Sequence, residues 1–214
     1  MTADPDFIAM LAHELRGPLA PLRTSLEVLK RPNIPESTKE RARVIMERQV
    51  VQMAHLIDEL VEIARIGRGQ LQLQLGRSAL RDIVEAAGEA AAPVLSEREQ
   101  ALLVDLPPSP LWLRVDHARV VQALGCLLTH ASHARDRGEP VRLHAQVDES
   151  GMAITLAAGP GTVPATRAVQ KQRLDVDVLL AQRLLELHGA TLQTLQDGEL
   201  VVRLPAQLVE PDSA

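Results

Sequence analysis

The chain has 214 residues, 46% of them hydrophobic, and a formal net charge of −5. No apolar run approaches the roughly 18 residues that a membrane span needs, and the N-terminus lacks the basic and apolar stretches of a secretory signal. The single cysteine excludes an internal disulfide, so we expect a cytoplasmic protein. The negative net charge disfavours a nucleic acid as the main partner, and we expect no membrane partner.

The first third of the sequence predicts two long helices. Apolar or small residues recur at alternating spacings of three and four, which is typical of a helix in a bundle. They are Ile8, Leu11, Leu15, Pro18, Leu22, Ser25 and Leu29, then Met46, Val50, Met53, Ile57, Leu60 and Ala64. Prolines at 32 and 35 separate the two series, and Gly67 and Gly69 end the second helix, which we place at about Glu36 to Ile66.

Two helices joined by a short turn form an antiparallel hairpin. A hairpin alone has too little partner surface to bury both apolar series. Pairing with a second copy would complete a four-helix bundle, so we expect a homodimer.

From Gln70 the pattern changes to short alternating runs and shorter helices. Leu71, Leu73 and Leu75 alternate with glutamines and predict a short strand. Further strands are predicted at Ala101 to Leu106, Trp112 to Val115, Val141 to Val147, Met152 to Leu156, Thr191 to Leu195 and Leu200 to Leu204. Helices are predicted at about Leu80 to Leu95, His117 to Ala134 and Val176 to His188.

This mixture predicts an α+β fold in which one helical layer covers a mostly antiparallel sheet. We therefore divide the chain into a dimerising helical hairpin at residues 1–69, an α/β sandwich at residues 70–208 and a flexible tail at residues 209–214.

One stretch of the first helix carries a specific motif. Residues Phe7 to Leu19 read Phe-Ile-Ala-Met-Leu-Ala-His-Glu-Leu-Arg-Gly-Pro-Leu, which resembles the phosphoacceptor box of sensor histidine kinases. The second helix is similar to that family as well, through Glu47 to Gln49, Leu56 to Leu60 and Arg65 to Gly69. The resemblance implies that His13 accepts a phosphoryl group.

Helical phase supports this role. His13 lies two residues from Leu11 and from Leu15, about 200° around the helix from each, so it points away from the apolar series. An exposed imidazole can attack a phosphoryl group, and Glu14 can fix its tautomer or act as general base. Pro18 would bend the helix just beyond the site. The alternative is a surface histidine beside a solvated glutamate.

The resemblance also implies a partner surface and a lost function. Receiver domains of response regulators would dock along the first helix at Ala20, Arg23, Thr24 and Glu27. Four residues after the histidine, the family often has threonine or asparagine, which positions water for dephosphorylation of the partner. Because Gly17 stands there, we do not expect phosphatase activity.

The second domain resembles the ATP-binding domain of these kinases but departs from it at the nucleotide positions. Val115 to Leu124 and Ala181 to Gly189 look like the helices that flank the site. Where the family has Asn-Leu-Leu-x-Asn-Ala, with the second asparagine holding Mg²⁺, this chain has Cys126-Leu-Leu-Thr-His130-Ala. Where an aspartate would recognise adenine, it has Ala157.

The phosphate loop departs too. The family's glycine-rich loop is replaced by Leu174 to Leu179, in which Asp175 and Asp177 would repel phosphates. The segment 162–173 is too short for the usual lid. We therefore expect no bound nucleotide and no cofactor of the chain's own, with any Mg²⁺ supplied by the receiver partner.

Cys126, His130 and His133 offer another interpretation. Their spacings of four and three place them on one helical face, and such side chains can ligate zinc. The simpler interpretation, which we favour, is that they are remnants of a site no longer under constraint, so no metal is expected.

Three functions are compatible with this sequence. The first is a histidine phosphotransfer protein in a phosphorelay, in which His13 exchanges a phosphoryl group with receiver aspartates without ATP. The second is a non-catalytic pseudokinase that sequesters a response regulator or pairs with a partner histidine kinase. The third is a kinase with an aberrant ATP site, or one phosphorylated by an intact partner kinase.

Overall fold

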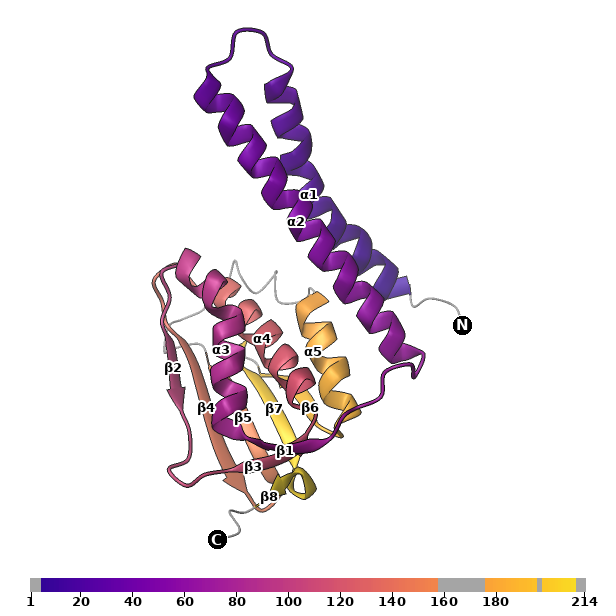
Figure 1. Ribbon diagram of the computed structural model, residues 1–214, viewed down its shortest axis with the longest axis vertical. Helices are drawn as coiled ribbons and strands as arrows, with labels where there is room; N and C mark the ends of the chain where they lie inside the picture. The colour runs from indigo at the N-terminus through magenta and orange to yellow at the C-terminus, as the bar shows by residue number, and fades with distance from the viewer. Residues whose placement is uncertain (1–4, 158–175, 196–197, 211–214) are drawn as a thin grey trace. The chain divides into compact units, whose positions relative to one another are not determined.

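The computed structural model describes residues 5–157, 176–195 and 198–210, apart from the side chains of residues 5–10, His13 and Ala157. It divides into two compact units, a helical unit up to residue 64 and a sheet unit from residue 65 onward (Figure 1). Among the described residues, no helix combines the length and the apolarity that a bilayer crossing requires.

The helical unit is the predicted hairpin. Helix α1 spans Pro5–Leu29 and helix α2 spans Glu36–Gly67, and the two lie side by side (Figure 1). Pro32 and Pro35 lie in the turn between them, where Asn33 adopts a positive φ of 59°. The backbone N–H of Thr38 donates to the carbonyl of Pro35 at 2.9 Å, which begins α2.

One face of each helix is shielded within the hairpin. Pro18 and Ser25 of α1 and Ala42 of α2 are buried. The predicted series on α2 separates into two sets. Met46, Met53 and Leu60 are half-buried, whereas Val50 and Ile57 are 58% and 51% exposed. A helix packed against a single partner can shield only one of these sets.

The sheet unit is the predicted α+β sandwich. Its main sheet has the order β2-β4-β5-β7-β6, and helices α3, α4 and α5 cover one face (Figure 1). The strands are β2 Leu102–Asp105, β4 Val141–Asp148, β5 Gly151–Ala157, β6 Thr191–Thr194 and β7 Leu200–Pro205; the helices are α3 Leu80–Glu97, α4 His117–His133 and α5 Val176–Leu187. Only the β2–β4 pairing is parallel among the described strands of this sheet, which is therefore mostly antiparallel as predicted.

The core lies between the sheet and the helical layer. Val141, Leu143 and Ala145 alternate along β4 and are buried, while the residues between them are exposed. They face helices whose apolar residues recur at helical spacing, such as Leu124 and Leu128 of α4, both fully buried. The buried residues, which recur every second position on the strands and every three or four positions on the helices, therefore form one interface between the sheet and the helices.

Two sequence-based expectations were wrong. Residues 70–75 form no strand, and the strand instead begins one residue later as β1 Gly76–Ala79, which pairs with β3 Trp112–Val115. Leu71 and Leu73 are half-buried in a segment without regular secondary structure, in which a side chain, and not a strand ladder, accepts a backbone N–H. The backbone N–H of Gln74 donates to a carboxylate oxygen of Asp116 at 2.8 Å.

The second correction concerns the tail. Val209 and Glu210, which the sequence assigned to the tail, form β8, which pairs with β3 and follows a 3-10 turn at Ala206–Leu208. The carboxylate of Glu210 lies 3.3 Å from the Nε of Arg77, whose guanidinium stacks on Trp112. The ladder to β3 and this ion pair hold the short strand, and residues 211–214 lie outside the described part.

Candidate phosphoacceptor and nucleotide-site residues

Position 13 lies within α1, which continues as a helix through Pro18 and Pro21. The side chain of His13 is outside the described part, so its predicted exposure stays a prediction. Glu14 is half-buried and has an interaction partner. Gly17 is exposed, and a Cβ added there would meet open space, so crowding does not explain the glycine.

The four predicted partner-contacting residues lie on the first helix beyond position 13. Ala20, Thr24 and Glu27 follow position 13 at spacings of seven, four and three, which places them on one face. Ala20, Thr24 and Glu27 are exposed, and the hydroxyl of Thr24 donates to the carbonyl of Ala20 at 3.1 Å. Arg23 lies beside them and is exposed as well. The hydrogen bond from Lys30, 2.9 Å away, lowers the pKa of Glu27, so this face carries both signs of charge at neutral pH.

The hairpin also exposes a stripe of large apolar side chains. On α2 the stripe comprises Val50, Ile57 and Val61, which helical spacing places on one side. On α1 Leu19 and Leu26 are 48% and 49% exposed. Isolated exposed leucines are ordinary, but apolar residues that recur at spacings of seven and four form a surface suited to another helix.

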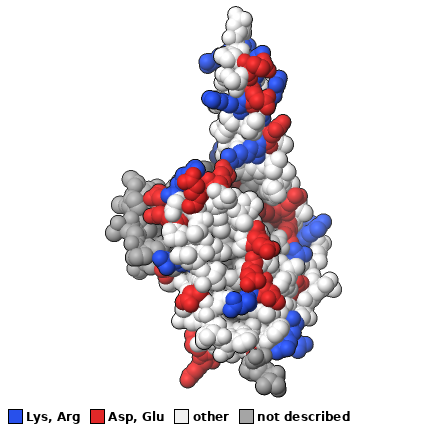
Figure 2. Space-filling model, turned by 60° about the vertical axis from the view of Figure 1, so that its left-hand side comes forward, with Lys and Arg blue, Asp and Glu red and all other residues white. Residues whose placement is uncertain are grey.

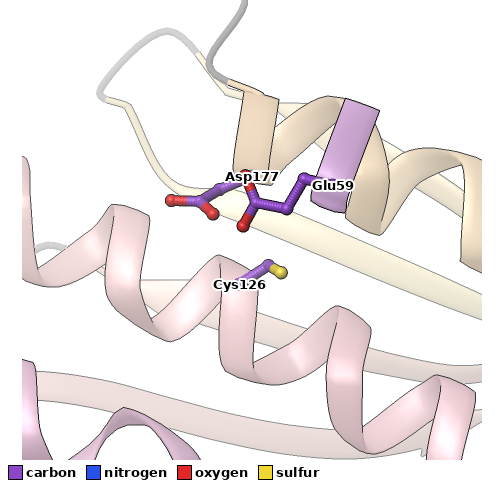
Figure 3. Close-up of side chains that lie close together, drawn as sticks. All are labelled: Glu59, Cys126 and Asp177. Atoms are coloured by element: carbon purple, nitrogen blue, oxygen red, sulfur yellow. The ribbon is translucent and has the colours of Figure 1, made fainter. Parts of the chain in front are cut away.

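In the sheet unit, some of the predicted nucleotide-site positions come together. Cys126 and His130 lie on α4 and are half-buried, and Asp177 lies in the first turn of α5. The thiol sulfur of Cys126 and a carboxylate oxygen of Asp177 are within 4.8 Å of each other (Figure 3). The carboxylate of Asp177 lies at the start of α5, where the free backbone N–H groups of a helix favour the binding of an anion.

The other predicted positions are only partly placed. Ala157 ends β5, with its side chain outside the described part, and Asp175 and the segment 162–173 lie outside it entirely. Among the described residues, Cys126, His130 and His133 do not form a group close enough to hold a metal ion, and His133 is exposed.

A hydrogen-bonded network that sequence reasoning missed joins three distant segments of the sheet unit. Asp116 caps α4 by accepting from the N–H of Arg119 at 3.2 Å, and its second oxygen accepts from Gln74. Its own N–H donates to the Nε2 of His188 at 3.1 Å, and the Nδ1 of His188 lies 2.9 Å from the carbonyl of Leu184. An aspartate directly before a helix is a cap signal, but nothing local indicated His188.

The hydrogen bonds of His188 assign its tautomer. A carbonyl only accepts, so Nδ1 must carry the proton, and an N–H only donates, so Nε2 must be the acceptor. This tautomer satisfies both partners, and both His188 and Asp116 are buried.

Comparison with known proteins matches these features. Residues 5–69 match the His Kinase A (phospho-acceptor) domain. The sensor histidine kinase TrcS of Mycobacterium tuberculosis is 34% identical over 128 residues, which are 58% of this chain and 24% of TrcS. The chain thus spans about a quarter of that relative's length.

Solved structures match the fold over nearly the whole chain. Histidine kinase AdeS of Acinetobacter baumannii has a TM-score of 0.66 at 19% identity, over 91% of this chain and 98% of that one. Histidine kinase ThkA, solved in complex with response regulator protein TrrA, has a TM-score of 0.70 at 14% identity, over 98% of this chain and 63% of that one. The chain therefore belongs to the sensor histidine kinase family, with a phosphoacceptor helix pair followed by a domain that has the fold of the family's ATPase domain.

Proposed function

We propose that the protein is a histidine phosphotransfer protein of a two-component phosphorelay, in which His13 exchanges a phosphoryl group with receiver-domain aspartates without binding ATP. The observation that carries the proposal is the contrast between the two units. The helical unit keeps the His13-Glu14 pair of the family, whereas Asp177 and Cys126 occupy the helices that flank the nucleotide in its kinases.

The negative charge at the start of α5 supports the proposal that the chain does not bind ATP. A helix start attracts phosphate through its backbone N–H groups and dipole, but a carboxylate in the first turn competes for the same positive charge. Asp177 is that carboxylate. On α4, His130 stands where the family has a Mg²⁺-holding asparagine, and a neutral or protonated imidazole is a poorer Mg²⁺ ligand than an oxygen donor.

Transfer from a receiver needs no nucleotide on the histidine side. The imidazole nitrogen of His13 attacks the phosphorus of the phosphoaspartate, a P–N bond forms, and the P–O bond to the aspartate breaks, which restores the carboxylate. Glu14 orients the imidazole and takes up its displaced proton. The reverse reaction passes the phosphoryl group to a second receiver, and the Mg²⁺ belongs to the receiver's acidic pocket.

The exposed surfaces of the hairpin support the proposed partners. The stripe of Val50, Ile57 and Val61 on α2, with Leu19 and Leu26 on α1, would be covered by a second copy of the hairpin in a four-helix bundle. The face at Ala20, Arg23, Thr24 and Glu27 would then stay open for a receiver domain. Histidine kinase ThkA binds a response regulator, which is in keeping with a receiver as partner here.

The relatives' names favour one alternative, a kinase that phosphorylates His13 from ATP in its own site or through a partner kinase. A non-catalytic pseudokinase would leave the His13-Glu14 pair without a purpose. One experiment separates the three: the protein is incubated with labelled ATP and Mg²⁺, or with a labelled phosphorylated receiver. Label on His13 only from the receiver supports phosphotransfer, label from ATP alone supports a kinase, and label from neither supports a binding role.

A further inference from the structure

Helix α1 contains two prolines, Pro18 and Pro21, and the helix continues through both. Proline has no backbone N–H, so each of them removes one hydrogen bond to the carbonyl four residues earlier. The carbonyls of Glu14 and Gly17 therefore lack the donor that α1 would otherwise supply to them. Both carbonyls belong to the turn that follows position 13.

The two carbonyls differ in their surroundings. A helix carbonyl is directed along the axis toward the residue four positions later, which is the buried Pro18 for Glu14 but the half-buried Pro21 for Gly17. Gly17 itself is exposed, and a Cβ added to it would meet no atom within 4 Å. The carbonyl of Gly17 therefore lies toward the open side of α1, while that of Glu14 is directed toward the shielded side.

The neighbouring side chains leave the Gly17 carbonyl accessible. In a helix, the side chains that cover a carbonyl come from the following turn. On the exposed side these are Ala20, which has only a methyl group, and Thr24, whose hydroxyl donates to the carbonyl of Ala20 at 3.1 Å. The ring of Pro21 also crowds the carbonyl of Gly17, which favours an outward tilt of that carbonyl.

This carbonyl lies on the face proposed for the receiver domain. Gly17 follows position 13 by four residues and precedes Ala20 and Thr24 by three and seven, so helical phase places them on one side of α1. Figure 2 shows lysine and arginine groups mixed with aspartate and glutamate groups along the hairpin. Charges of both signs attract a partner over a distance, whereas a hydrogen-bond acceptor also fixes its orientation.

We propose that the carbonyl oxygen of Gly17 is a docking group, which accepts a hydrogen bond from an N–H or O–H group of the receiver domain. The inference rests on the proposed phosphotransfer and adds a positioning residue to it. In the unbound chain, water hydrates this carbonyl, and the docked receiver replaces the water with its own donor. The hydrogen bond holds the receiver one turn beyond position 13, so that its phosphoaspartate approaches the phosphoacceptor in one register.

The first test observes the carbonyl directly in the full chain. Carbon-13 at glycine carbonyls and nitrogen-15 at proline select the glycines that precede a proline in NMR spectra, and the signal lost in Gly17→Ala is that of Gly17. The probe is an unphosphorylated receiver domain that transfers its phosphoryl group to His13 when it is phosphorylated. Adding this receiver is expected to move the Gly17 carbonyl signal to higher frequency, as a new hydrogen bond to a carbonyl does.

A matched pair of proline variants tests what the acceptor contributes. Pro21→Ala returns an N–H to α1, which bonds the Gly17 carbonyl within the helix, and is expected to weaken receiver binding about three- to tenfold. The loss should appear in KM for transfer more than in kcat. Pro93→Ala makes the same change at an exposed proline inside α3 and is expected to bind the receiver as the wild type does. Circular dichroism and light scattering check that both variants keep the helices and the oligomeric state of the wild type.

The outcomes separate this inference from the function on which it rests. A Gly17 signal that does not move when the receiver saturates the chain, or equal binding by Pro21→Ala and Pro93→Ala, would overturn the docking role and leave phosphotransfer in place. If no phosphorylated receiver labels His13, the proposed function is wrong and the docking role falls with it.

Discussion

The thiol of Cys126 and the carboxylate of Asp177 approach within 4.8 Å of each other, across two helices of the sheet unit. Asp177 lies in the first turn of α5 and Cys126 in the middle of α4. In the resembled kinases, these helices hold phosphates and Mg²⁺. In this chain the two helices bring together a carboxylate, which would repel phosphates, and a soft thiol, which is a poor ligand for Mg²⁺.

The first prediction is that ATP does not bind measurably, with or without Mg²⁺. The family's residues for Mg²⁺ and adenine are replaced here by His130 and Ala157 as well, so Asp177→Gly alone is not expected to restore ATP binding. Isothermal calorimetry checks this, with an intact sensor kinase as the positive control. A micromolar affinity in the wild-type chain would return the active-kinase alternative to first place.

The second prediction concerns the dimer. Ile57 is 51% exposed on the hairpin, and Ile57→Lys would place an unpaired charge in the proposed helix–helix interface, at a cost of several kcal/mol. The variant is expected to be a monomer by light scattering at micromolar concentration. Gln52→Lys adds the same charge to an exposed position on another side of α2 and should stay dimeric. If the wild type is itself a monomer, the proposed bundle is wrong.

The third prediction concerns the receiver surface. Ala20→Arg adds a bulky charge to the exposed face of α1 that contains Thr24 and Glu27, and is expected to slow transfer from a receiver about tenfold. The dimer should persist, because Ala20 does not belong to the apolar stripe. Ser37→Arg, at the exposed start of α2, serves as the control. Equal rates for the two variants would place the receiver elsewhere.

The fourth prediction concerns His188. His188→Ala removes the acceptor for the buried N–H of Asp116 and is expected to lower the free energy of unfolding by about 1–3 kcal/mol, with faster hydrogen exchange at Gln74. His144→Ala is the matched control, because its imidazole is exposed and pairs with the exposed Asp105. Nitrogen NMR shifts should report a proton on Nδ1 of His188. A proton on Nε2 would contradict the network.

Periodicity predicted most of the fold because each element buries one face. The hairpin, the helices at 80, 117 and 176, and most strands were found within a few residues of their bounds. The segment 70–75 was assigned wrongly because Leu71 and Leu73 are half-buried on either side of the exposed Gln72, which gives the alternation of a strand without a strand partner. What distinguishes them is the partner of the Gln74 N–H, which is the side chain of Asp116 rather than another strand.

Long-range features could not be predicted from local pattern. His188 and Asp116 lie 72 residues apart, and only the fold brings them together. The two residues of β8 are too few to show a period. By contrast, the phosphoacceptor motif was identified because its residues are contiguous, and comparison with the family confirms that domain.

The central claim is tested most directly by following labelled phosphate from a phosphorylated receiver to His13. The wild type is expected to take up the label, His13→Ala to take up none, and Glu14→Ala to be slowed by about a hundredfold. His55→Ala, which removes an exposed histidine of α2, should behave as wild type. Labelled ATP with Mg²⁺ should leave the wild type unlabelled. If ATP labels His13 while phosphorylated receivers do not, the protein is a kinase and the proposed phosphotransfer function is contradicted.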